Sequence, residues 1–120
     1  NTFAFPGNNM KWHHRFFKFN ITNGTLYIYK KSGNASRPYK EFNLSKNNIL
    51  IVPLKPNVEL KHRRNIILIK EDNKNNNSNT SNSNEPKTVL TLSCRSEGIF
   101  YSWLQAFSNC NVLKHLFYEV

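Results

Sequence analysis

Short stretches with strand-like patterning fill most of this chain, and a stretch with helical spacing comes last. Seven stretches carry β-branched or alternating apolar residues between turn signals. They are Thr2–Phe5, Trp12–Phe19, Thr25–Lys31, Tyr39–Leu44, Asn48–Leu54, Asn65–Glu71 and Lys87–Ser93. Ser96-Glu97 then provides a hydroxyl cap and a first-turn acid, which predict the start of a helix. Because a small antiparallel sheet must close or be covered, this order predicts a mainly β fold: a seven-stranded antiparallel bent barrel or sandwich capped by a C-terminal α-helix.

The helical stretch has an apolar stripe along one side. Four apolar residues recur at spacings of three and four: Ile99, Trp103, Phe107 and Cys110. The same spacing returns in Leu113–Val120, so the helix either continues to the end of the chain or breaks near Asn109 and Asn111. We interpret Trp103 and Phe107 as core residues.

The chain is short and strongly basic. Its 120 residues are enough for one domain with a modest core, which we place at residues 1–120. The net charge of +10 implies an acidic partner, which is a nucleic acid, an anionic membrane or an acidic protein. No apolar run approaches the ~20 residues of a membrane-spanning helix. Cys94 and Cys110 lie too far apart along the predicted elements for a disulfide, so we expect free thiols and a reducing, cytoplasmic setting.

One segment breaks the pattern of alternating strands. Asp72–Pro86 is nearly all Asn and Ser and has no apolar residue to bury. Such a segment has nothing to offset its ordering entropy, so we interpret it as a disordered loop inserted between two strands.

Two of the strands are predicted to form a hairpin with a cationic end. Trp12–Phe19 and Thr25–Lys31 flank Asn23-Gly24, a strong turn signal because both residues tolerate positive φ. Side chains alternate along a strand, so basic residues here share a face with apolar ones. Folding the hairpin gathers three of them at one end of that face: His13, Arg15 and Lys30. A cationic mouth of this kind predicts an anion-binding site.

The order of the elements, together with three motifs, resembles that of a pleckstrin homology (PH) domain. The motifs are Trp12-His-His-Arg15-Phe16-Phe17, Leu26-Tyr-Ile-Tyr29-Lys-Lys31 and a late helical Trp103. The resemblance covers nearly the whole chain when Asp72–Pro86 is skipped. It implies a PH-like barrel whose early loops form the ligand end.

The resemblance also implies a function with a particular preference. PH domains that bind phosphoinositides tightly carry a Lys late in the first strand, then a basic residue two before an Arg in the second. Arg15 matches that Arg, whereas Phe5 and His13 stand at the other two positions. We therefore expect a membrane-targeting module that binds an anionic phospholipid, with phosphatidic acid favoured over polyphosphoinositides.

The predicted site combines donors for a phosphate with residues for membrane contact. Arg offers a planar fork for two phosphate oxygens, and Lys offers a point charge. The predicted headgroup-binding residues are Arg15, Lys30, Lys11, Arg37, Lys31 and His13. Trp12 and Met10 are predicted to insert into the membrane. The alternative for Trp12 is that it covers the outer face of the barrel.

Catalytic and metal-binding patterns are missing from the sequence. It has no Ser-His-Asp arrangement, no Gly-rich phosphate loop and no paired acidic motif. His62 and His115 are far from His13 and His14, without the spacing of metal ligands. We therefore expect no enzymatic activity, no cofactor and no metal.

Other partners and a second basic segment stay open at this stage. A PH-like barrel can bind peptides along its fifth strand and helix, here Asn48–Leu54 and Ile99–Phe107, so an acidic protein or peptide is the alternative partner. Nucleic acid is disfavoured, because Tyr27 and Tyr29 are more simply interpreted as barrel packing. The densest basic run, Lys61-His62-Arg63-Arg64, is a solvated loop, a second membrane contact or a nucleic-acid patch.

The Asn-rich insertion is similar to those found inside folded domains of some protozoan parasites. Among PH-like chains there are acylated PH-domain proteins that sense phosphatidic acid on secretory organelles. This chain begins at Asn1 without a methionine, as an excised fragment would, and an acylation signal would precede it. This resemblance implies peripheral attachment to the cytosolic face of a membrane, such as that of secretory vesicles. We also expect the protein to be a monomer.

Overall fold

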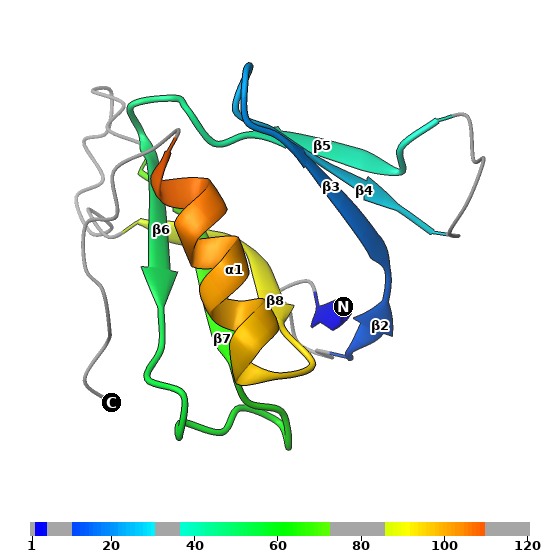
Figure 1. The fold of residues 1–120 in the computed structure, drawn as a ribbon, viewed down its shortest axis with the longest axis vertical. Helices are drawn as coiled ribbons and strands as arrows, with labels where there is room; N and C mark the ends of the chain where they lie inside the picture. The colour runs from blue at the N-terminus through cyan, green and yellow to red at the C-terminus, as the bar shows by residue number, and fades with distance from the viewer. Residues whose placement is uncertain (1, 5–10, 31–36, 73–85, 110–120) are drawn as a thin grey trace, which may run out of the picture.

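Two antiparallel sheets and a helix form the computed structural model, which describes residues 2–4, 11–30, 37–72 and 86–109 (Figure 1). One sheet has five strands in the order β2-β1-β8-β7-β6, and the other has three in the order β3-β4-β5. The elements are β1 (Thr2–Ala4), β2 (His13–His14), β3 (Phe16–Asn20), β4 (Thr25–Tyr29), β5 (Lys40–Asn43), β6 (Ile49–Pro53), β7 (Ile66–Glu71), β8 (Lys87–Ser93) and α1 (Glu97–Ser108). The predicted mainly β fold, with a helix after the last strand, is confirmed.

The predicted strand Trp12–Phe19 is two strands in the structure. His13–His14 pairs with β1 in the five-stranded sheet, and Phe16–Asn20 pairs with β4 in the three-stranded sheet. Arg15 lies between them, where the chain passes from one sheet to the other. The prediction of a single strand is wrong here because alternation along a sequence does not show where pairing changes from one sheet to another.

The predicted hairpin is confirmed for β3 and β4, and its turn is longer than the Asn23-Gly24 signal. Phe17 pairs with Ile28, and Phe19 pairs with Leu26. Four residues, 21–24, form the turn, in which Gly24 has a φ of 72°. A Cβ added at Gly24 would lie 2.9 Å from the Cβ of Ser45, so both the backbone angle and the close approach favour glycine there.

A single apolar cluster joins the two sheets and α1. Leu26 and Ile28 come from the three-stranded sheet, and the buried aliphatic residues of β6, β7 and β8 face them. Phe107 of α1 is fully buried, and its ring centroid lies 5.0 Å from that of Phe19. Burying a side chain of this size contributes roughly 1.5–3 kcal/mol, so the helix holds the two sheets together.

The helix begins as predicted, and the predicted core residues Trp103 and Phe107 pack into the core, but Ile99 of the predicted stripe does not. Ser96 caps it, because its hydroxyl accepts a hydrogen bond from the Ile99 N–H at 3.3 Å. Ile99 is 38 % exposed, whereas Phe100 and Leu104 are buried and Trp103 is partly buried. Apolar residues occupy two adjacent rows of this helix, and packing against the sheets selects the row that starts at Phe100.

Several predictions fall outside the described residues. The Asn-rich insertion between Asp72 and Pro86, the thiol of Cys110 and the possible extension of the helix past Asn109 all lie there. Within the described part of the chain, no helix is long and apolar enough to cross a membrane.

Candidate anion-binding site

Arg15 and Lys30 converge on the ring of Tyr39. Arg15 lies at the bend between β2 and β3, Lys30 follows β4, and Tyr39 precedes β5. The Lys30 Nζ is 4.6 Å from the centroid of the Tyr39 ring, and the Arg15 Cζ is 5.5 Å from it. The structure therefore brings the two best-supported predicted residues together, on an aromatic side chain that sequence reasoning did not assign to the site.

The backbone explains why these three residues meet. Phe16 pairs with Tyr29, so Arg15 and Lys30 lie one residue beyond this pair, just outside β3 and β4. The Tyr39 N–H donates to the Ile28 carbonyl at 2.6 Å and so fixes the third strand beside them. Like charges opposite each other on a sheet repel, and the aromatic face offsets this by about 0.5–2 kcal/mol for each cation.

The other predicted residues are placed less specifically. Lys11 and Arg37 are exposed, and they precede Arg15 and Tyr39 by four and two residues. His13 is partly buried and pairs with Phe3 of β1. Lys31 and Met10 lie outside the described residues. Headgroup contact by these residues stays a prediction.

Trp12 contacts a loop that is distant in sequence. Its indole N–H donates to the Lys61 carbonyl at 3.0 Å, and its side chain is partly buried. Membrane insertion of Trp12 stays a prediction. The hydrogen bond shows that the densest basic run of the chain lies beside the start of β2.

The charges of arginines from three separate parts of the chain act on His14. Thr2 pairs with both His14 and Ser93, so the end of β8 and the following Arg95 come close to β2. Desolvation, followed by surrounding positive charges that include Arg95, Arg15 and Arg63, lowers the pKa of His14 below its ordinary value of 6.5. Sequence reasoning did not find Arg95, and only its place directly after a predicted strand would have indicated it.

The family follows from a comparison with known proteins. A family model described as PH domain matches residues 3–111. The chain belongs to the PH domain family. PH domains are general modules for binding lipids or proteins, and they are typically not catalytic. No curated protein matches the chain.

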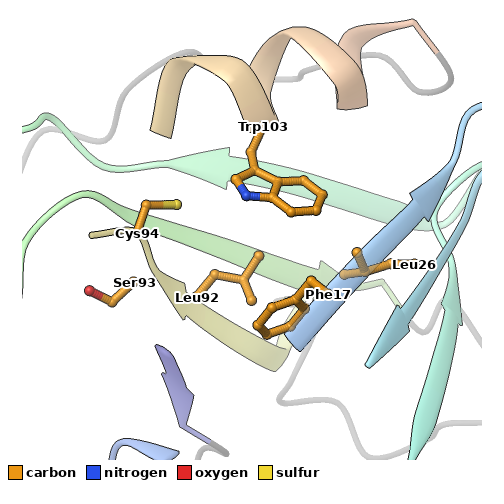
Figure 2. Close-up of a pocket in the computed structure, with 6 residues that line it drawn as sticks. All are labelled: Phe17, Leu26, Leu92, Ser93, Cys94 and Trp103. Atoms are coloured by element: carbon orange, nitrogen blue, oxygen red, sulfur yellow. The ribbon is translucent and has the colours of Figure 1, made fainter. Parts of the chain in front are cut away.

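One cavity among the described residues of this PH domain is too small for a lipid headgroup. Figure 2 shows an apolar cavity where Trp103 reaches from α1 toward Phe17 of β3. Its lining residues are Phe17, Leu26, Leu92, Ser93, Cys94 and Trp103. The cavity volume is about 10 Å³, which is the size of a single water site rather than of a headgroup.

The described part of the chain holds one cysteine, Cys94, and it is buried. Burial raises the pKa of Cys94 to about 11, so its thiol is a poor nucleophile near neutral pH. Within the described ranges, no three His, Cys, Asp or Glu side chains gather as metal ligands would. The Arg15–Lys30 pair on Tyr39 is the candidate site, and two neighbouring cations can bind an anion.

Proposed function

We propose that this PH domain is a membrane-targeting module that binds an anionic phospholipid through Arg15 and Lys30. The observation that carries the proposal is their convergence on the Tyr39 ring. Both cations are held near one point before any ligand arrives, so binding a phosphate there orders few additional side chains. The net charge of +10 adds a general attraction to acidic membranes.

Phosphatidic acid suits this pair better than a polyphosphoinositide does. Its headgroup is a single phosphomonoester, which two cations can neutralise. A polyphosphorylated inositol needs more donors, and His13 and Phe5 stand where the family signature has cations. The smaller headgroup is therefore the proposed ligand.

Attachment through this site is reversible. Each cation close to an anionic surface contributes about 1 kcal/mol, and salt weakens the attraction. We propose peripheral attachment to the cytosolic face of a membrane, of which secretory vesicles are one candidate. We therefore expect the affinity for anionic vesicles to fall as ionic strength rises.

Vesicle flotation tests the proposal. Wild type should float with phosphatidic acid vesicles, less with polyphosphoinositide vesicles and not with phosphatidylcholine. The double variant Arg15→Ala/Lys30→Ala should bind at least tenfold more weakly, since it loses about 1 kcal/mol for each of two cations. The control Lys46→Ala/Lys87→Ala removes the same charge at two exposed residues away from the site. Equal losses of vesicle binding in the two double variants would show that only the net charge matters. That result would overturn the site.

A peptide-binding function has one observation in its favour. β6 is an edge strand of the five-stranded sheet, and α1 lies alongside it in Figure 1. An edge strand can accept an added peptide strand through its backbone groups. Pull-down of a protein partner that survives Arg15→Ala/Lys30→Ala would favour this function over lipid binding.

A further inference from the structure

The outer face of the three-stranded sheet carries two aromatic residues on alternate positions of β4. Tyr27 and Tyr29 are half-buried, whereas their neighbours Leu26 and Ile28 are fully buried in the core that α1 covers. Because side chains alternate along a strand, both tyrosines face away from that core. The interpretation of these tyrosines as packing inside the barrel is therefore wrong.

An open groove of about 480 Å³ lies along the two tyrosine rings. Its lining residues are Lys18, Phe19, Asn20, Ile21, Tyr27 and Tyr29. Small-molecule sites in proteins range from about 300 to 1,000 Å³. The groove therefore has room for a planar group such as a nucleobase.

Lys18 places a positive charge in the groove. It is exposed, it pairs with Tyr27 across the two strands, and its Nζ lies 5.4 Å from the centroid of the Tyr29 ring. An exposed contact of this kind is worth about two- to fivefold in an equilibrium constant. Stacking of a base on an aromatic side chain is worth about 5- to 150-fold. A base can therefore replace the ammonium group on the ring, and the ammonium group can then bind the phosphate of the nucleotide.

Polar side chains beside the tyrosines suit the edge of a base. The Asn20 Oδ1 accepts hydrogen bonds from the N–H groups of Thr22 and Asn23 at 2.9 and 3.2 Å, so the amide NH₂ group of Asn20 remains to donate to a ligand. Glu41 of β5 is exposed and pairs with Tyr27 from the other side. A carboxylate can accept a hydrogen bond from the exocyclic amino group of cytosine.

We propose that this face binds single-stranded nucleic acid, with bases stacked on Tyr27 and Tyr29 and a phosphate on Lys18. Sheet faces that carry aromatic residues stack the bases of single-stranded RNA in other folds. A nucleic acid carries one phosphate for each base, which matches two rings beside one cation. An acidic peptide would need more cations than the groove provides. The net charge of +10 adds a general attraction for a polyanion.

Fluorescence anisotropy with a labelled oligocytidine of about 12 nucleotides tests the proposal. Wild type should bind the single strand, as RNA or as DNA, more tightly than a duplex of the same length. Tyr27→Val/Tyr29→Val keeps residues that suit a strand and should bind at least 25-fold more weakly, the product of two factors of about five. Tyr27→Phe/Tyr29→Phe keeps both rings and should bind like wild type. The control Tyr101→Ala, which removes an aromatic side chain that is 46 % exposed on α1, should also bind like wild type.

Lys18→Ala provides a second measurement at an exposed residue, where the substitution leaves the core intact. The slope of log affinity against log salt concentration should become shallower by about 0.7, the value for one phosphate contact with a single strand. Lys46→Ala removes the same charge from an exposed residue outside the groove and should leave the slope closer to that of wild type. Equal slopes in the two variants would overturn the phosphate contact.

The remaining outcomes separate this surface from the proposed lipid site. Wild-type affinity in Tyr27→Val/Tyr29→Val would overturn the proposal. Displacement of the oligonucleotide by polyglutamate at equal charge concentration would also overturn it, and would assign the face to an acidic protein. Arg15→Ala/Lys30→Ala should bind the oligonucleotide like the control Lys46→Ala/Lys87→Ala, and the tyrosine variant should still float with phosphatidic acid vesicles. The two functions can therefore fail independently.

Discussion

The ammonium group of Lys30 lies 4.6 Å from the centroid of the Tyr39 ring, and the Arg15 guanidinium approaches the same ring at 5.5 Å. The aromatic face offsets part of the repulsion between these two like charges. Tyr39 precedes β5, whereas Arg15 precedes β3 and Lys30 follows β4, so the site depends on three neighbouring backbone segments. Such an arrangement reduces the ordering cost of binding a phosphate.

Replacing Tyr39 should show how much this arrangement contributes. Tyr39→Leu removes the aromatic face, and we expect vesicle binding to fall by about 0.5–2 kcal/mol, the worth of a cation–π contact. Tyr39→Phe keeps the face and should bind like wild type. Both variants should remain folded, since the side chain is 38 % exposed. Flotation would contradict the role of the ring if Tyr39→Leu matched Tyr39→Phe.

The strained backbone of the turn at Lys61–Arg64 gives a prediction for stability. His62→Gly relieves a positive φ of 69° that costs about 1–2 kcal/mol, while glycine adds about 0.5–1 kcal/mol of unfolded-state entropy. The net expectation is a gain of roughly 0.5–1 kcal/mol in the free energy of unfolding, measured with urea. Asn57→Gly, an exposed site in the same loop, has no such strain to relieve and should lose stability. A loss for His62→Gly as large as that for Asn57→Gly would show that the turn is unstrained.

Local rules predict part of the candidate site, and long-range pairing determines the rest. Alternation along each strand and the turn before Thr25 are local, so the meeting of Arg15 and Lys30 could be predicted. The bend at Arg15 and the approach of Arg95 depend on how β2 and β8 both pair with β1, which no local pattern reveals. The helical pattern predicts Trp103 and Phe107 as core residues correctly, but it does not show that Phe100 is buried and Ile99 exposed, since both fit an apolar stripe.

The buried thiol of Cys94 should be slow to react and should make stability depend on pH. Burial raises its pKa from an ordinary value of 9.0 to about 11, so the folded state keeps the proton where the unfolded state releases it. Stability is therefore expected to fall as pH rises from about 9 through 11, because the folded state then binds more protons than the unfolded state. Urea titrations of Cys94→Ala and wild type at several pH values measure this difference.

With Cys110→Ser as background, alkylation of Cys94 at pH 8 should be slow until urea unfolds the chain. Rapid alkylation of the folded protein would contradict the burial.

His14 should make membrane binding depend on pH. Desolvation and nearby cations, including Arg95, Arg15 and Arg63, hold its pKa below 6.5 in the unbound protein. Anionic headgroups on those arginines would offset the repulsion and raise the pKa of His14 on binding. Binding would then take up a proton, so the affinity should increase as pH falls through the interval between the bound pKa and the lowered unbound pKa. Phosphatidic acid also titrates, so the measurement is the difference in pH dependence between wild type and His14→Gln on identical vesicles. The same pH dependence in both proteins would show that His14 stays outside the field of the bound lipid.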